Sequence, residues 1–249
     1  MNEISKDVLP DYLQTYQGET GTEGLSKFVS PKYLKLIQGM SKARKELGLP
    51  EGTAILDDKT VVFPPDGHVM VTPILQWDQY ELWYQKAAGM SNPVKDRSFD
   101  HTSDLAQVCL GPPKGWRVPD PDHAGCELIY KHVICYSLWV HALEKPVIIT
   151  CSGGGHKSGK RFGELIFNRG DRYPITAGVY KMYQTTKTSQ TSGDDYQALA
   201  FDNAGWNDQE TNDKLFKEFV RLRDALKDNL LFGDSGEEKE EDEETEAKF

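Results

Sequence analysis

Residues 127–141 read ELIYKHVICYSLWVH, a run dominated by β-branched and aromatic side chains. These side chains favour a pleated strand, so the run predicts a long strand. Shorter segments that also indicate strands lie on both sides of it, at 54–56, 61–63, 69–71, 79–84, 147–150, 178–186 and 196–201. No helical pattern separates the middle strands, and the whole predicts a mainly β (α+β) protein, either a small barrel or a sandwich.

The segments between these runs carry turn residues. Asp57-Asp58, the PPDG sequence at 64–67, and Asp78 are expected to end strands. Residues 86–125 are rich in Gly, Pro, Asp and Ser, and we expect them to form a long loop inserted into the sheet.

Two helices are expected at the ends of the β region. Ser30-Pro31 is typical of a helix start, and the apolar spacing that follows predicts a helix near 31–47 that Gly48 would end. Leucine and phenylalanine at steps of three and four predict a second helix over 207–231, with Asn207 or Asp208 as its cap.

Charge is distributed unevenly along the 249 residues, whose net charge is -10. The last sixteen residues, 234–249, hold nine acids and two lysines, whereas 145–187 holds eight Lys/Arg against two acids. We therefore expect a flexible N-terminal arm (1–26), one domain (27–233) and a disordered acidic tail (234–249). No apolar run reaches the length of a membrane span, and the four cysteines come without an export signal, which predicts a cytosolic protein.

The sequence 154–160, GGHKSGK, fits the first seven positions of a phosphate-binding loop. Its next residue is Arg161, where such a loop needs Ser or Thr to hold a metal ion. We expect instead a flexible glycine-rich hairpin that carries cations, and keep a nucleotide-dependent enzyme as an alternative.

A second pattern has the spacing of metal ligands, in His123-x-x-Cys126 and His132-x-x-Cys135. His132 and Cys135 would lie on opposite faces of a strand. A zinc site would be sterically easier from His101, Cys109, His123 and Cys126. We expect buried thiols and a surface histidine there, with no metal and no cofactor, and leave zinc as the alternative.

The basic segment 145–187 also carries aromatic residues, and an earlier hairpin adds tryptophans. Cations contact phosphates, and aromatic faces stack unpaired bases with little sequence preference. The alternative is that the aromatics are core and the cations a solvated face. The residues expected to contact single-stranded nucleic acid are Lys157, Lys160, Arg161, Arg169, Arg172, Tyr173, Lys181, Tyr183, Lys187, Trp77 and Trp83.

The chain resembles bacteriophage single-stranded-DNA-binding proteins, in its acidic tail ending at Phe249 and in the basic stretch from Lys157 to Lys187. A looser likeness covers the order of elements from about Ser30 to Leu231. The resemblance implies an OB-type antiparallel β-barrel, elaborated here by the N-terminal helix, the long loop and the C-terminal helix.

The resemblance also implies a non-enzymatic protein that protects single-stranded DNA during replication, recombination or repair, in the cytoplasm of the host cell if the protein is viral. It implies that the tail competes with DNA for the basic groove and recruits polymerase or helicase, through Glu243, Glu244, Glu246 and Phe249. A homodimer is left open. A structural virion protein is a further alternative, in which the charges only set solubility.

Overall fold

The structure, a computed structural model, describes residues 32–39, 42–84, 94–111, 117–121, 127–169, 173–189 and 193–227. All of them belong to the larger of the two compact units of the chain, residues 31–231. The predicted arm (1–26) and the acidic tail (234–249) lie outside the described residues. No helix among the described residues is long and apolar enough to cross a membrane.

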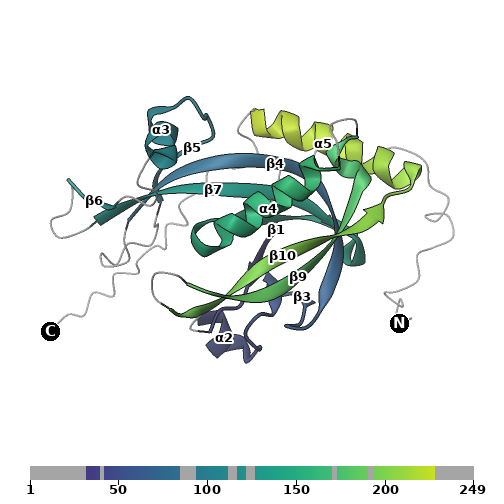
Figure 1. Cartoon of the computed structure of the whole chain (residues 1–249), viewed down its shortest axis with the longest axis horizontal. Helices are drawn as coiled ribbons and strands as arrows, with labels where there is room; N and C mark the ends of the chain where they lie inside the picture. Colours follow the sequence, from purple (N-terminus) through teal and green to yellow (C-terminus); the bar gives the residue numbers. More distant parts are fainter. Residues whose placement is uncertain are drawn as a thin grey trace, which may run out of the picture. The chain divides into compact units, whose positions relative to one another are not determined.

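Ten strands of the described residues form one sheet (Figure 1). They are β1 (Lys32–Leu36), β2 (Ala54–Leu56), β3 (Val61–Phe63), β4 (His68–Tyr84), β5 (Val94–Ser98), β6 (Arg117–Pro119), β7 (Glu127–Val140), β8 (Lys145–Cys151), β9 (Gly178–Thr188) and β10 (Asp195–Trp206). The order is β10-β9-β4-β7-β8-β1-β2-β3, with β5 beside β4 and β6 beside β7. All pairs are antiparallel except β1 with β8.

The sheet curls strongly because β4 changes partners along its length. Residues 68–71 pair with β9, and a β-bulge between Pro73 and Leu75 then bends the strand along β7. At the other edge, Gln38 lies just after β1 and bridges to Gln197 of β10. Its Nε2 donates to the Gln197 carbonyl and its Oε1 accepts from the Gln197 N–H, both at 2.9 Å. The prediction of a mainly β fold is confirmed, and the curled sheet is compatible with a β-barrel.

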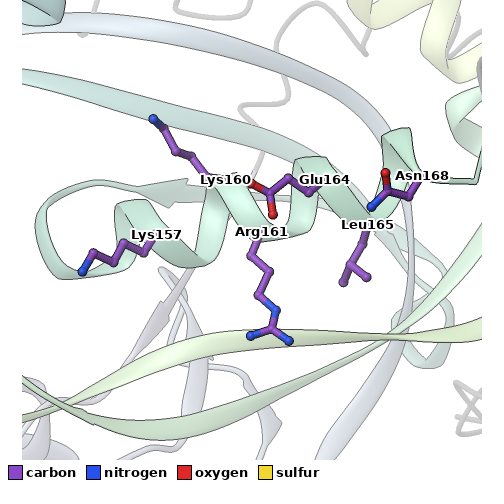
Figure 2. Close-up of a pocket in the computed structure, with 6 residues that line it drawn as sticks. All are labelled: Lys157, Lys160, Arg161, Glu164, Leu165 and Asn168. Carbon is purple, nitrogen blue, oxygen red and sulfur yellow. The ribbon is translucent and has the colours of Figure 1, made fainter.

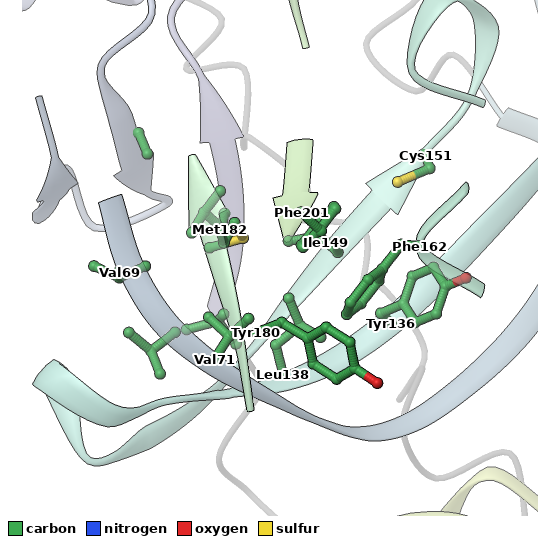
Figure 3. Close-up of a cluster of buried hydrophobic side chains, with 14 of the residues drawn as sticks. Val69, Val71, Tyr136, Leu138, Ile149, Cys151, Phe162, Tyr180, Met182 and Phe201 are labelled. Carbon is green, nitrogen blue, oxygen red and sulfur yellow. The ribbon is translucent and has the colours of Figure 1, made fainter. Parts of the chain in front are cut away.

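Helix α4 (His156–Phe167) crosses the inside of the curl (Figure 1). The main core lies between it and the sheet, and Figure 3 shows its side chains. Phe162 of α4 is fully buried. Its ring centroid lies 3.9 Å from that of Phe201, 5.0 Å from that of Tyr136 and 5.1 Å from that of Tyr180. One helical residue therefore ties together strands β7, β9 and β10.

The prediction of a helix over 31–47 is wrong for the first half of this segment. Residues 32–36 form β1, and only Lys42–Leu47 is helical, as α2. Leu34 is buried in the core, while Lys32 and Lys35 point outward to Asp58 (3.8 Å) and Asp57 (2.6 Å). The parallel pairing with β8, which is not visible locally, decides this conformation. Gly48 ends α2 as predicted, with φ +64 and its N–H bonded to the Arg44 carbonyl.

Two further predictions about the sheet are corrected. Asp78 does not end a strand, because β4 continues through it and its carboxylate is hydrogen-bonded to His132 of β7 at 2.9 Å. The segment 86–125, predicted as a loop, contains β5, β6 and the helix α3 (Asp104–Leu110). Ser103 caps α3, its side chain accepting from the Ala106 N–H.

The helix predicted over 207–231 is α5 (Gln209–Lys227), and 228–231 lie outside the described residues. Asp208 Oδ1 accepts from the Thr211 N–H at 2.7 Å, which is the predicted cap. Leu215 and Leu222 are buried, as the spacing indicates.

Candidate nucleic-acid interface

The glycine-rich sequence 154–160 forms a helix start rather than the predicted hairpin. Gly153–Gly155 make a single 3-10 turn, and α4 runs from His156. A Cβ on Gly159 would lie 2.7 Å from the Cβ of Cys151, and one on Gly163 would lie 3.0 Å from Tyr136 Oη. These two glycines therefore let α4 approach β7 and β8 closely. Lys160 lies in the second turn of the helix, so residues 154–160 do not form the open loop that would surround a phosphate.

The outer face of α4 carries three exposed cations, Lys157, Lys160 and Arg161, around a shallow hollow that ends at Asn168 (Figure 2). None of the Asp and Glu side chains that the structure describes forms an ion pair with them. Glu164 is the acidic residue on this face. The three cations outnumber this carboxylate, so the face carries a net positive charge that can attract a polyanion.

Residues 32–45 also carry several cations, namely Lys32, Lys35, Lys42, Arg44 and Lys45, but this segment differs from α4 in its ion pairs. Lys32 and Lys35 are paired with Asp58 and Asp57, and Arg44 lies 3.6 Å from Glu51. The charges of these three side chains are therefore balanced by nearby carboxylates.

Arg161 points from α4 toward β9 and β10 (Figure 2), across a cleft of about 200 Å³. The floor of this cleft is apolar and the rim is polar. Lys187 Nζ donates to Ser158 Oγ at 2.9 Å and so joins β9 to α4 across the cleft. Its lining residues are Ser158, Arg161, Phe162, Leu165, Tyr183, Thr185, Lys187, Leu199, Ala200, Phe201 and Asp202.

Tyr183 lies at the rim of this cleft. Burial and a hydrogen bond with Asp202 raise the pKa of its phenol, while Arg161 lowers it. Lys181 is nearby on the same strand, with its Nζ 5.6 Å from the Tyr183 ring centroid. The structure therefore brings together five of the predicted contact residues: Lys157, Lys160, Arg161, Tyr183 and Lys187. Lys181, also predicted, lies beside them.

Arg169, predicted to contact phosphate, is bound to its own chain. It donates to Asn203 Oδ1 and to the Val179 carbonyl, both at 3.1 Å, and to the Gly205 carbonyl. These bonds hold the β-bulge of β10. Because each of its three nitrogens already donates a hydrogen bond to its own chain, we leave Arg169 out of the phosphate-contacting set.

The two predicted tryptophans lie apart from α4. Trp77 is only 6% exposed, which leaves no ring face for a base. Trp83 lies near the end of β4, where Lys131 Nζ is 3.7 Å from its ring centroid and its Nε1 donates to Glu81. Arg172 and the tail residues Glu243, Glu244, Glu246 and Phe249 fall outside the described residues.

Trp206 was missed by the sequence analysis. It is exposed at the end of β10, and its ring centroid lies 5.0 Å from that of Tyr173, itself a predicted stacking residue. Trp206 lies beyond the basic segment 145–187, so charge and local spacing give no signal for it. Only the pairing of β9 with β10 brings it to the end of α4.

Several of the described histidines and cysteines take part in hydrogen bonds or lie in the core. Within the described ranges no three His, Cys, Asp or Glu side chains are grouped to hold a metal ion, and His123 and Cys126 lie outside them. His132 bonds Asp78 through Nε2 and His156 through Nδ1, at 2.9 and 3.1 Å. Cys109 is buried, and burial raises the pKa of its thiol.

Comparison with protein-family models, curated proteins and solved structures finds no match to this chain. The geometry of the chain itself therefore has to carry any functional assignment.

Proposed function

We propose that the protein is a non-enzymatic, sequence-tolerant single-stranded-DNA-binding protein whose DNA strand runs along the outer face of α4 and the adjoining cleft. The observation that carries this proposal is the group of exposed cations Lys157, Lys160 and Arg161 beside Tyr183 and Lys187. None of these three cations is ion-paired with an Asp or Glu that the structure describes. Lysine and arginine neutralise phosphates whatever the base sequence, and their binding releases counterions. This chemistry suits a protein that covers DNA without reading it.

The strand order supports the finer proposal of an OB-like barrel. Strands β4, β7, β8, β9 and β10 pair in the order 10-9-4-7-8, and α4 lies between β8 and β9. A five-stranded Greek-key barrel with a helix between its third and fourth strands has this order. Here β1 pairs in parallel with β8, and Gln38 bridges from it to β10, where such a barrel would close.

OB modules commonly bind nucleic acid across their second and third strands. The corresponding strands here, β7 and β8, are buried on both faces: Ile134 and Tyr136 belong to the core beneath α4, and Val133, Cys135 and Ile148 are buried on the other side. We therefore assign the DNA to α4 and β9 rather than to β7 and β8.

The acidic tail fits the same proposal as a site for other proteins. Residues 234–249 combine a high negative charge with the aromatic residue Phe249, which suits a basic-rimmed pocket on a polymerase or helicase. The protein would then protect DNA and recruit replication, recombination or repair proteins in the cytoplasm.

The test is a fluorescence-anisotropy titration of labelled oligo-dT at several salt concentrations. Lys160→Glu with Arg161→Glu should weaken binding at least about tenfold, and should lower the salt slope by about 1.4, for two lost phosphate contacts. The affinity of this double variant for oligo-dA should fall by a similar factor.

Lys214→Glu with Lys217→Glu is the matched control, because it makes the same charge change on the exposed side of α5. Equal losses in both double variants would mean that net charge, not this surface, governs binding. No affinity of the unmodified protein for either oligonucleotide at about 0.15 M salt would refute the function itself.

A further inference from the structure

Three large aromatic side chains are exposed together at the end of α4. Phe167, Tyr173 and Trp206 are 76%, 57% and 55% exposed. Tyr173 and Trp206 are in contact, their ring centroids 5.0 Å apart and their planes tilted by 58°. Isolated exposed apolar residues are ordinary, but a contiguous group of rings indicates a binding surface. We name these three residues the aromatic patch.

Arg169 fixes the base of this patch. Its guanidinium lies 4.5 Å from the Tyr180 ring centroid and 4.6 Å from that of Trp206, so it is in contact with both rings. The hydrogen bonds of Arg169 to β9 and β10 hold the guanidinium still. A hollow of about 180 Å³ is left beside it, lined also by Ile166, Pro174 and Ile175. The Trp206 ring is thus held by Arg169 and is still half exposed. A ring that is already fixed in place can bind a flat ligand without a large loss of conformational entropy.

The aromatic patch continues the cationic face of α4. The hollow that begins at Lys157 ends at Asn168, which lies between Phe167 and Arg169 in the chain. Lys157 and Phe167 are ten residues apart on one helix, or about 15 Å. A strand whose phosphates lie on Lys157, Lys160 and Arg161 is therefore led directly to the exposed rings.

We propose that the aromatic patch stacks an unpaired base of the strand bound along α4, with Trp206 as the main platform. This inference rests on the proposed function and names a subsite of it. The arginine under Trp206 and the row of cations leading to it favour an anionic strand with planar bases over an apolar peptide. Stacking on an aromatic ring is tolerant of base identity, as the proposed function requires.

The experiment compares Trp206→Leu with Trp206→Phe, using oligo-dT and an abasic oligomer of equal length as probes. Trp206→Leu should weaken oligo-dT binding about 5- to 150-fold, the range for loss of one stacked base. Binding of the abasic oligomer and the salt slope should stay unchanged. Trp206→Phe should bind oligo-dT nearly as well as the unmodified protein, but with less quenching of tryptophan fluorescence.

Two further variants test whether the effect belongs to the aromatic patch. Phe167→Ala removes the most exposed ring of the patch, so it cannot act through lost core packing, and it should weaken oligo-dT binding in the same direction. Phe216→Leu removes a 45% exposed ring on α5 and should leave binding unchanged.

The outcomes separate the two proposals. If the unmodified protein binds neither oligomer, the proposed function fails and this subsite with it. If it binds oligo-dT but Trp206→Leu binds equally well, only the stacking subsite is overturned, and an apolar peptide becomes the better occupant. Equal losses for oligo-dT and the abasic oligomer would also overturn it, because Trp206 would then act through phosphate contacts or the fold.

Discussion

The two faces of α4 contrast sharply, although they belong to the same twelve residues. The inner face holds Gly159, Phe162 and Gly163 against β7, β8 and β10, where added volume has no room. The outer face holds Lys157, Lys160 and Arg161 in contact with solvent. The difference teaches that the sequence GGHKSGK, which fits the pattern of a phosphate-binding loop, contributes residues to both faces of one helix. Some of them pack against the sheet and others carry exposed charge.

The largest expected effect tests the inner face. Phe162→Ala should lower the free energy of unfolding by about 3–5 kcal/mol, because it leaves a cavity among Tyr136, Tyr180 and Phe201. Phe167→Ala, at the exposed end of the same helix, should change it by no more than about 0.5 kcal/mol. Urea denaturation of both variants measures the contrast, and similar losses would mean that the two faces are not distinct.

Glycine at the inner face should be required for close approach. Gly159→Ala should destabilise the protein, because strain of about 1–3 kcal/mol against Cys151 outweighs a helix-propensity gain of about 1 kcal/mol. Gly155→Ala is the matched control, since a Cβ there meets nothing within 4 Å. The same urea experiment applies, and a stabilised Gly159→Ala variant would contradict the packing described for α4.

Arg169 tests the same comparison, because it is a cation whose hydrogen bonds hold the fold together, as the inner-face residues do. Arg169→Lys should cost about 1–2 kcal/mol of stability, since an ammonium cannot reproduce the fork that reaches Asn203 and Val179. In Arg169→Gln, which removes the charge, the salt slope of oligo-dT binding should not change. Arg161→Lys should leave thermal stability unchanged. A drop of about 0.7 in the slope for Arg169→Gln would instead return Arg169 to the phosphate contacts.

The smallest effect concerns Tyr136, whose Oη donates to the Gly159 carbonyl at 2.8 Å under the inner face. Tyr136→Phe should cost about 0.5–1.5 kcal/mol at pH 7. Burial raises the pKa of the Tyr136 phenol above its ordinary value of 10. Above pH 10 the unfolded chain releases this proton while the folded chain keeps it, so stability falls as pH rises. The difference between the two proteins should therefore shrink in urea midpoints measured from pH 7 to 10.5, and a constant difference would contradict the burial of this phenol.

The strands were predictable because their signal is local. Residues 127–140 and 61–63 are rich in β-branched and aromatic side chains, residues 54–56 are a short apolar run, and all three form strands in the structure. Helix α4 was not predictable in this way, since glycine has a low helix propensity and four glycines lie in 153–159. Its helical form depends on packing against Cys151 and Tyr136, which are near it only in the folded chain.

The sequence by itself determined the mainly β class, the C-terminal helix, and the concentration of cations and aromatics over 145–187. Only the tertiary structure decided which of those residues are available for binding. Arg161 and Arg169 are equivalent as letters, yet one faces an open cleft and the other is enclosed by three acceptors of its own chain. Likewise Trp77 became core while Trp206 joined Tyr173 at the surface. The physical reason is that burial and hydrogen-bond partners come from segments distant in the chain, which no local pattern records.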